Sequence, residues 1–97
     1  MPLATFQNKT KSEITFGVFG RRDTSHFHIR IAAGHPPETP SEEFTNGYAY
    51  CFAVWLDQDD GKLYPDNGHA YLTGHKVTSS HITVTLTESG LTVVDNV

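Results

Sequence analysis

The longest apolar run in the chain, residues 46–57, most constrains the fold. It begins with Asn46-Gly47, a turn sequence, and ends in the polar segment 57–61. Side chains of an extended strand alternate between two faces, and both faces are apolar here. One face carries Tyr48, Tyr50, Phe52, Val54 and Leu56, and the other carries Ala49, Cys51, Ala53 and Trp55. Because aromatic and β-branched residues favour a strand over a buried helix, we predict a central β-strand that is covered on both sides or a strand that lies in a packed interface.

Shorter segments with alternating apolar and polar residues flank this run, and turn sequences separate them. We predict extended segments at residues 4–7, 13–19, 26–33, 62–64, 69–73, 81–87 and 91–94. No stretch of the sequence shows the periodicity of a helix. The pattern predicts an all-β fold, namely a small antiparallel β-sandwich of about seven strands; the alternative is a small, cupin-like β-barrel. The length of 97 residues suits a single domain covering residues 1–97.

The order of these segments sets three local expectations. Residues 4–7 and 13–19 are expected to pair as an N-terminal hairpin across the polar turn 8–12. The segment 34–45 contains three prolines, which lack N–H donors, so it is expected to be irregular. The alternation places seven residues in the core: Phe16, Ile29, Phe52, Val54, Ile82, Val84 and Leu86.

Composition and charge exclude several classes of partner. The formal net charge is −4 and the sequence contains no cluster of lysine and arginine, which argues against nucleic-acid binding and against a polybasic membrane anchor. The single cysteine, Cys51, allows no intramolecular disulfide. No stretch reaches transmembrane length, and the first residues lack the pattern of a signal peptide. A cytoplasmic location is therefore the default expectation, with export by another route left open.

Six histidines are the most unusual feature of the composition. His26 and His28 lie two residues apart in a predicted strand, so their side chains project from one face and are spaced to share a metal ion. Gly20, followed after five residues by His26-Phe27-His28, is similar to the start of the first cupin motif. This resemblance implies a divalent metal held by His26 and His28, with His69 as a third ligand. The cupin motif continues with a glutamate, whereas residues 29–33 contain no carboxylate.

A second candidate site is aromatic. Tyrosine and tryptophan are enriched in contact surfaces because they bury a large area and keep one polar atom. The candidate ligand-binding residues are Trp55, Tyr48, Tyr50, Tyr64 and Tyr71. Trp55 is the one most expected to lie outside the core, because it shares its face only with small residues. We expect binding around Trp55 and the segment 34–45, since a sandwich core covers only one face of the central strand.

These features favour a non-enzymatic binding module that recognises a protein, a glycan or a lipid head group through the aromatic strand and the proline-rich loop. The sequence contains no motif of nucleophilic or phosphate chemistry, so catalysis is not favoured and no cofactor is expected. One alternative is a small cupin-like metal-binding protein or enzyme that uses His26 and His28. The other is a structural subunit that self-associates as a homo-oligomer through the face of Ala49 and Trp55.

Overall fold

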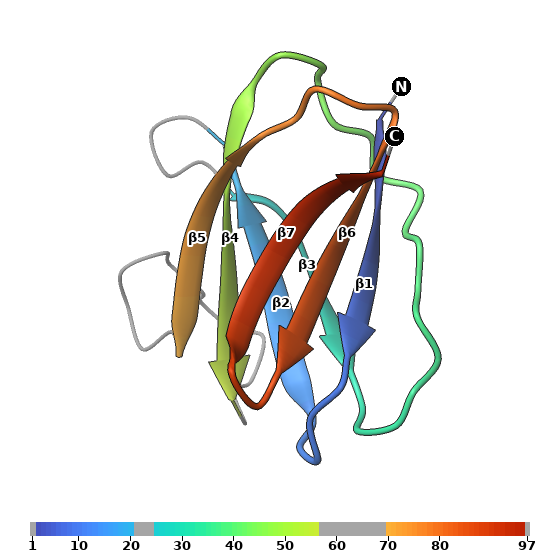
Figure 1. The fold of residues 1–97 in the computed structure, drawn as a ribbon, viewed down its shortest axis with the longest axis vertical. Helices are drawn as coiled ribbons and strands as arrows, with labels where there is room; N and C mark the ends of the chain where they lie inside the picture. Colours follow the sequence, from blue (N-terminus) through green and yellow to red (C-terminus); the bar gives the residue numbers. More distant parts are fainter. Residues whose placement is uncertain (1, 21–24, 57–69, 97) are drawn as a thin grey trace.

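The structure, a computed structural model, describes residues 2–20, 25–56 and 70–96, with only the main chain of Ser25 and His26. Within these ranges the chain forms seven strands, and none of the residues lies in a helix that could cross a membrane (Figure 1). The strands are β1 Leu3–Asn8, β2 Ile14–Phe19, β3 Ser25–Ile31, β4 Ala49–Leu56, β5 Tyr71–Lys76, β6 His81–Thr87 and β7 Gly90–Asn96.

Two sheets pack face to face around one core, which confirms the predicted all-β sandwich. One sheet has the strand order β1-β6-β7 and the other has the order β3-β2-β4-β5. The described strands do not close into a barrel, so the cupin-like alternative is wrong for this part of the chain. All the predicted core residues except Ile29 are buried between the sheets, and Ile29 is half-buried against the same cluster. The predicted strand at residues 62–64 lies outside the described residues.

The pairing of β1 differs from the predicted N-terminal hairpin, which is wrong. β1 pairs with β6 in parallel, from Leu3 opposite His81 to Asn8 opposite Leu86, whereas β2 lies in the other sheet between β3 and β4. The turn between β1 and β2 therefore crosses from one sheet to the other. Asn8 holds this turn, because its buried amide donates to the carbonyl oxygens of Ser12 and Ile31 and accepts from the N–H of Thr10.

The proline-rich segment 34–45 is irregular, as predicted, and it runs along the outer edge of β1. Phe6 and Glu38 exchange two main-chain hydrogen bonds, of 2.7 and 3.0 Å. Near the other end of the segment, the N–H of Phe44 donates to the carbonyl of Pro2, and the Phe44 ring is fully buried in the core. The segment thus covers an edge strand, which reduces the exposure of unpaired main-chain groups. It also contributes one side chain to the core.

The central strand β4 is buried on both faces, as the apolar run predicted. Its inward side chains join the main core, and its outward side chains Ala53 and Trp55 form a second cluster with Phe19 of β2, against which Cys51 packs. The Phe19 and Trp55 rings meet edge to face, with centroids 5.8 Å apart. The outer face of the β3-β2-β4-β5 sheet therefore carries a small hydrophobic cluster of its own.

Candidate functional site

The structure separates the predicted aromatic residues instead of bringing them together. Tyr48 is 48% exposed, just before β4. Tyr50 is buried in the core, where its hydroxyl accepts a hydrogen bond of 2.8 Å from the Thr45 N–H, and Tyr71 is half-buried against the core. Tyr64 lies outside the described residues. Of the candidate rings that the structure describes, Tyr48 presents the most surface to a ligand, and ligand binding by these residues stays a prediction.

Trp55 has no exposed surface, although the sequence suggested that its ring lies outside the core. The ring packs against its own sheet over Gly17 of the neighbouring strand β2: a β-carbon added at Gly17 would be 2.4 Å from the ring atom Cζ3. The missing side chain makes room for the indole against its own sheet. Self-association through the face of Ala49 and Trp55 stays a prediction, and so does ligand binding by Trp55, whose ring has no exposed surface in this structure.

The predicted metal ligands are described only in part. His28 is exposed on β3, the side chain of His26 is not described, and His69 lies outside the described residues. Among the side chains that the structure describes, no group of three histidines, cysteines or carboxylates is close enough to hold a metal ion. The metal site of His26, His28 and His69 therefore stays a prediction.

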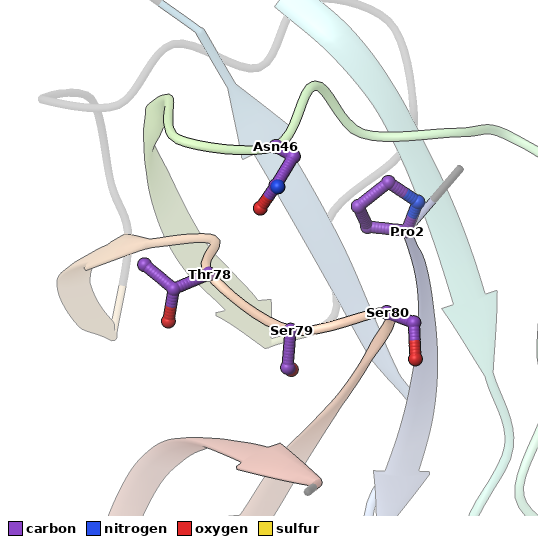
Figure 2. Close-up of a pocket in the computed structure, with 5 residues that line it drawn as sticks. All are labelled: Pro2, Asn46, Thr78, Ser79 and Ser80. Carbon is purple, nitrogen blue, oxygen red and sulfur yellow. The ribbon is translucent and has the colours of Figure 1, made fainter.

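A pocket of about 300 Å³ opens at the end of the sandwich where β1 begins. It is lined by Pro2, Asn46, Thr78, Ser79 and Ser80. In Figure 2 the Asn46 side chain reaches from the turn before β4 toward the segment 78–80, which connects β5 to β6. Within the described part of the chain, neither the Asn46 amide nor the Ser80 hydroxyl makes a hydrogen bond. The pocket thus offers two polar side chains whose hydrogen-bonding capacity is available to a ligand.

Main-chain hydrogen bonds fix the three segments that build this pocket. The N–H of Gly47 donates to the Val77 carbonyl at 2.7 Å, and the N–H of Val77 donates to the Tyr48 carbonyl at 2.9 Å. Gly47 has a φ of 88°, a conformation that glycine adopts without strain, so the Asn46-Gly47 sequence makes this tight turn possible. The N–H of Leu3 donates to the Ser80 carbonyl and brings the start of β1 to the same place.

A polar network lies directly behind the segment 78–80. Asp95, near the end of β7, accepts hydrogen bonds from the hydroxyls of Thr78 (3.2 Å) and Ser79 (3.3 Å), and one of its oxygens lies 3.0 Å from Nε2 of His75. The hydrogen bond from His75 is the main cause that lowers the pKa of Asp95 below its ordinary value of 3.8, against a smaller opposing effect of burial. Asp95 is therefore ionised at neutral pH.

This network contains a serine, a histidine and an aspartate, but its geometry is not that of a catalytic triad. A serine nucleophile needs a histidine within hydrogen-bonding reach to take its proton. The Ser79 hydroxyl instead lies 2.7 Å from the His81 carbonyl and 3.3 Å from Asp95, and it makes no hydrogen bond with His75. Both partners of Ser79 are acceptors, so the arrangement holds the hydroxyl proton in place and does not activate the oxygen.

Sequence reasoning found Tyr48 in this region but missed Asn46 and Ser80. The sequence marked Asn46-Gly47 as a turn, and nothing local indicated that this turn meets residues 78–80. The comparisons with known proteins add no second source of information: no family model matches the chain, and neither a curated protein nor a solved structure matches it.

Proposed function

We propose that this protein is a non-enzymatic binding module and that its ligand is a glycan, held at the pocket of residues 2, 46 and 78–80. The observation that carries the proposal is the pair of polar side chains, Asn46 and Ser80, that face this pocket without a partner in the described chain. An amide and a hydroxyl each donate and accept hydrogen bonds, as sugar hydroxyl groups also do. A pocket with a few convergent polar groups is the usual form of a small-molecule site.

Tyr48 supports the same ligand class. It lies two residues after Asn46, in the turn that is hydrogen-bonded to Val77, and about half of its surface is exposed. A tyrosine ring offers a large flat apolar face with one polar atom, which suits the apolar face of a sugar ring. The sequence predicted a binding site between the proline-rich segment and the aromatic strand. Asn46 and Tyr48 lie where the chain passes from that segment into β4, so the proposed site overlaps the predicted one.

The other two ligand classes find less support at this surface. A lipid head group that carries phosphate needs lysine or arginine, and none lines the pocket. A protein partner needs a contiguous apolar patch. Two of the large exposed apolar residues, Leu72 and Val94, occupy outward positions on β5 and β7, which belong to different sheets, so they point away from each other.

The test is a titration of the isotope-labelled protein with methyl glycosides of glucose, galactose, mannose and N-acetylglucosamine, followed by amide chemical shifts. We expect at least one of these sugars to shift the amides of residues 46–48 and 78–80. Tyr48→Ala and Asn46→Ala should each weaken that binding about fivefold or more, whereas Leu72→Ala, which removes an equally exposed apolar side chain, should leave it unchanged. If every sugar leaves these amides unmoved, or shifts another surface instead, the proposal is wrong.

A further inference from the structure

The turn before β4 contains a sequence that is chemically reactive. Asn46-Gly47 is one of two Asn-Gly pairs in the chain, and the other, Asn67-Gly68, lies outside the described residues. Asparagine before glycine is prone to spontaneous deamidation, because glycine has no side chain to keep its nitrogen away from the preceding amide. The sequence alone therefore marks Asn46 as a site of modification.

The reaction consumes water and releases ammonia. The Gly47 nitrogen gives its proton to hydroxide and attacks Cγ of Asn46. The side-chain nitrogen then leaves, takes a proton from water and becomes ammonia, which closes a five-membered succinimide. A second water opens this ring at either carbonyl, so that the asparagine becomes aspartate or isoaspartate. The step that the fold can control is the attack by the Gly47 nitrogen.

In the structure Asn46 is exposed to water, but the nitrogen that would attack it is engaged. The Gly47 N–H donates to the carbonyl of Val77 at 2.7 Å, and Val77 is fully buried. A nitrogen in a hydrogen bond to a carbonyl has to leave that acceptor before a base can take its proton. Deamidation of Asn46 therefore requires the turn to open.

Three further hydrogen bonds hold the turn closed. The N–H of Val77 donates to the Tyr48 carbonyl at 2.9 Å, and the N–H of Tyr48 donates to the Thr45 carbonyl at 3.2 Å. The N–H of Thr45 donates to the hydroxyl of Tyr50 at 2.8 Å, and Tyr50 is buried in the core. These bonds attach the turn on both sides of Asn46, so the Gly47 N–H leaves Val77 only in a local opening that breaks several of them together.

We infer that Asn46-Gly47 is a latent deamidation site, which the hydrogen bond from Gly47 to Val77 keeps closed in the folded protein. The bond preserves the Asn46 amide at the pocket. Aspartate would replace this amide with a carboxylate, and isoaspartate would also lengthen the main chain between residues 46 and 47. The inference concerns the main chain of the turn, so it holds whether or not the ligand is a glycan.

The experiment follows both Asn-Gly pairs of the full chain in a mildly alkaline buffer, in the folded protein and in concentrated urea. Trypsin separates the pairs, because cleavage after arginine and lysine places Asn46 in the peptide 31–62 and Asn67 in the peptide 63–76. Chromatography and mass spectrometry quantify the aspartate and isoaspartate forms. Asn46 should deamidate about tenfold or more slowly in the folded protein than in urea, since at least two hydrogen bonds open together. In urea Asn46 and Asn67 should react at similar rates.

Hydrogen exchange and a matched pair of variants identify the cause of the protection. Exchange of the Gly47 N–H and attack by the Gly47 nitrogen require the same opening, so folding should slow both rates by a similar factor. Tyr50→Phe removes the acceptor of the Thr45 N–H and keeps the buried ring, so it should speed both rates about two- to tenfold. Tyr71→Phe removes a hydroxyl that makes no hydrogen bond within the described chain, and it should change neither rate.

Two results would overturn the inference. In the first, Asn46 deamidates as fast in the folded protein as in urea. In the second, Tyr50→Phe speeds exchange of the Gly47 N–H while deamidation stays at the wild-type rate, so that the hydrogen bond is not what protects Asn46. Neither result bears on the glycan site, which the sugar titration tests separately.

Discussion

At the scale of single residues, Gly17 determines how the outer face of one sheet is built. It lies under the Trp55 ring, and a β-carbon at this position would approach the ring atoms Cζ3 and Cη2 to 2.4 and 2.9 Å and the Phe19 ring to 3.1 Å. Because Trp55 and Phe19 are both buried, the rings have little freedom to move away. The glycine is therefore required for space and not for backbone conformation.

We predict that Gly17→Ala lowers the free energy of unfolding by about 1–3 kcal/mol, as overpacking does. The measurement is urea-induced unfolding monitored by tryptophan fluorescence, which reports on the affected ring. Gly74→Ala is the matched control in the same sheet, since its added β-carbon would meet nothing closer than the Tyr50 carbonyl oxygen at 4.0 Å. Equal effects of the two substitutions would contradict the packing of Trp55 over Gly17.

The core prediction from the sequence can be tested in the other sheet. Val84 lies at the centre of β6 and has no exposed surface, so Val84→Ala should cost about 1–3 kcal/mol of unfolding free energy. Val94, on the neighbouring strand β7, is 47% exposed, and Val94→Ala should change stability by less than about 0.5 kcal/mol. If Val94→Ala proved the costlier of the two, the inward and outward faces of this sheet would be reversed.

At the scale of elements, Asn8 connects parts of the fold that no local pattern connects. Its amide links the end of β1 to Ser12 in the following turn and to Ile31 at the end of β3, which belongs to the other sheet. Two groups of Thr10, the N–H and the hydroxyl, donate to its oxygen. The buried side chain therefore satisfies main-chain groups where the chain crosses between sheets.

Asn8→Ala should lower the free energy of unfolding by about 1–3 kcal/mol, because it removes the buried hydrogen bond to the Ile31 carbonyl and the part-buried bonds to Ser12 and Thr10. Thermal and urea denaturation measure the change. Asn96 provides a comparison, since its amide donates to the Thr83 hydroxyl on the exposed face of the β1-β6-β7 sheet. Asn96→Ala should cost less than about 0.5 kcal/mol, and an Asn8→Ala cost of the same small size would show that the crossing does not depend on this amide.

The sequence predicts the elements of this fold better than their partners. Residues 81–87 alternate strictly because one face of β6 is buried, so the strand was predictable to the residue. The parallel pairing of β1 with β6 joins segments more than seventy positions apart and leaves no local pattern, whereas a hairpin with the next strand is the usual local solution. β5 extends beyond the predicted end at residue 73 to Lys76. Gly74 and His75 do not show the pattern of a strand, and the partner of His75, Asp95, is also distant in the sequence.

The candidate site was less predictable for the same reason. Its lining comes from the start of β1, the turn before β4 and the β5–β6 connection, and each of these segments is an ordinary polar stretch when taken alone. Tyr48 was a candidate because of its residue type, but the same argument also selected Tyr50 and Trp55, which the structure buries. Residue type identifies rings that could contact a ligand, and only the three-dimensional packing decides which of them reach the surface.

At the scale of the whole molecule, the two sheets are linked at one open edge of the sandwich. β5 and β7 are edge strands of different sheets that lie side by side there. Their inward residues His75 and Asp95 form a contact of 3.0 Å, and Thr78 and Ser79 attach the β5–β6 connection to the same carboxylate. Inward-pointing polar pairs of this kind also discourage pairing of an edge strand with another chain. Asp95 thus joins both sheets and the pocket.

This link makes acid stability depend on Asp95. Its pKa in the folded protein is lowered, first by the hydrogen bond from His75, below the ordinary value of 3.8 that applies to the unfolded chain. Ionised Asp95 therefore stabilises the fold at pH values above the unfolded pKa, and this contribution is lost as the pH falls through the lower folded pKa. We predict that Asp95→Asn flattens the decline of unfolding free energy with pH between about pH 5 and pH 2.

Urea unfolding at several pH values measures that slope for the wild type and the variant. Glu88→Gln is the control, because Glu88 is exposed in the β6–β7 turn and forms no ion pair within the described chain. It should retain the wild-type slope, since Glu88 takes no part in the contact between His75 and Asp95. If Asp95→Asn and the wild type lose stability in parallel as the pH falls, the link between His75 and Asp95 does not couple the two sheets in solution.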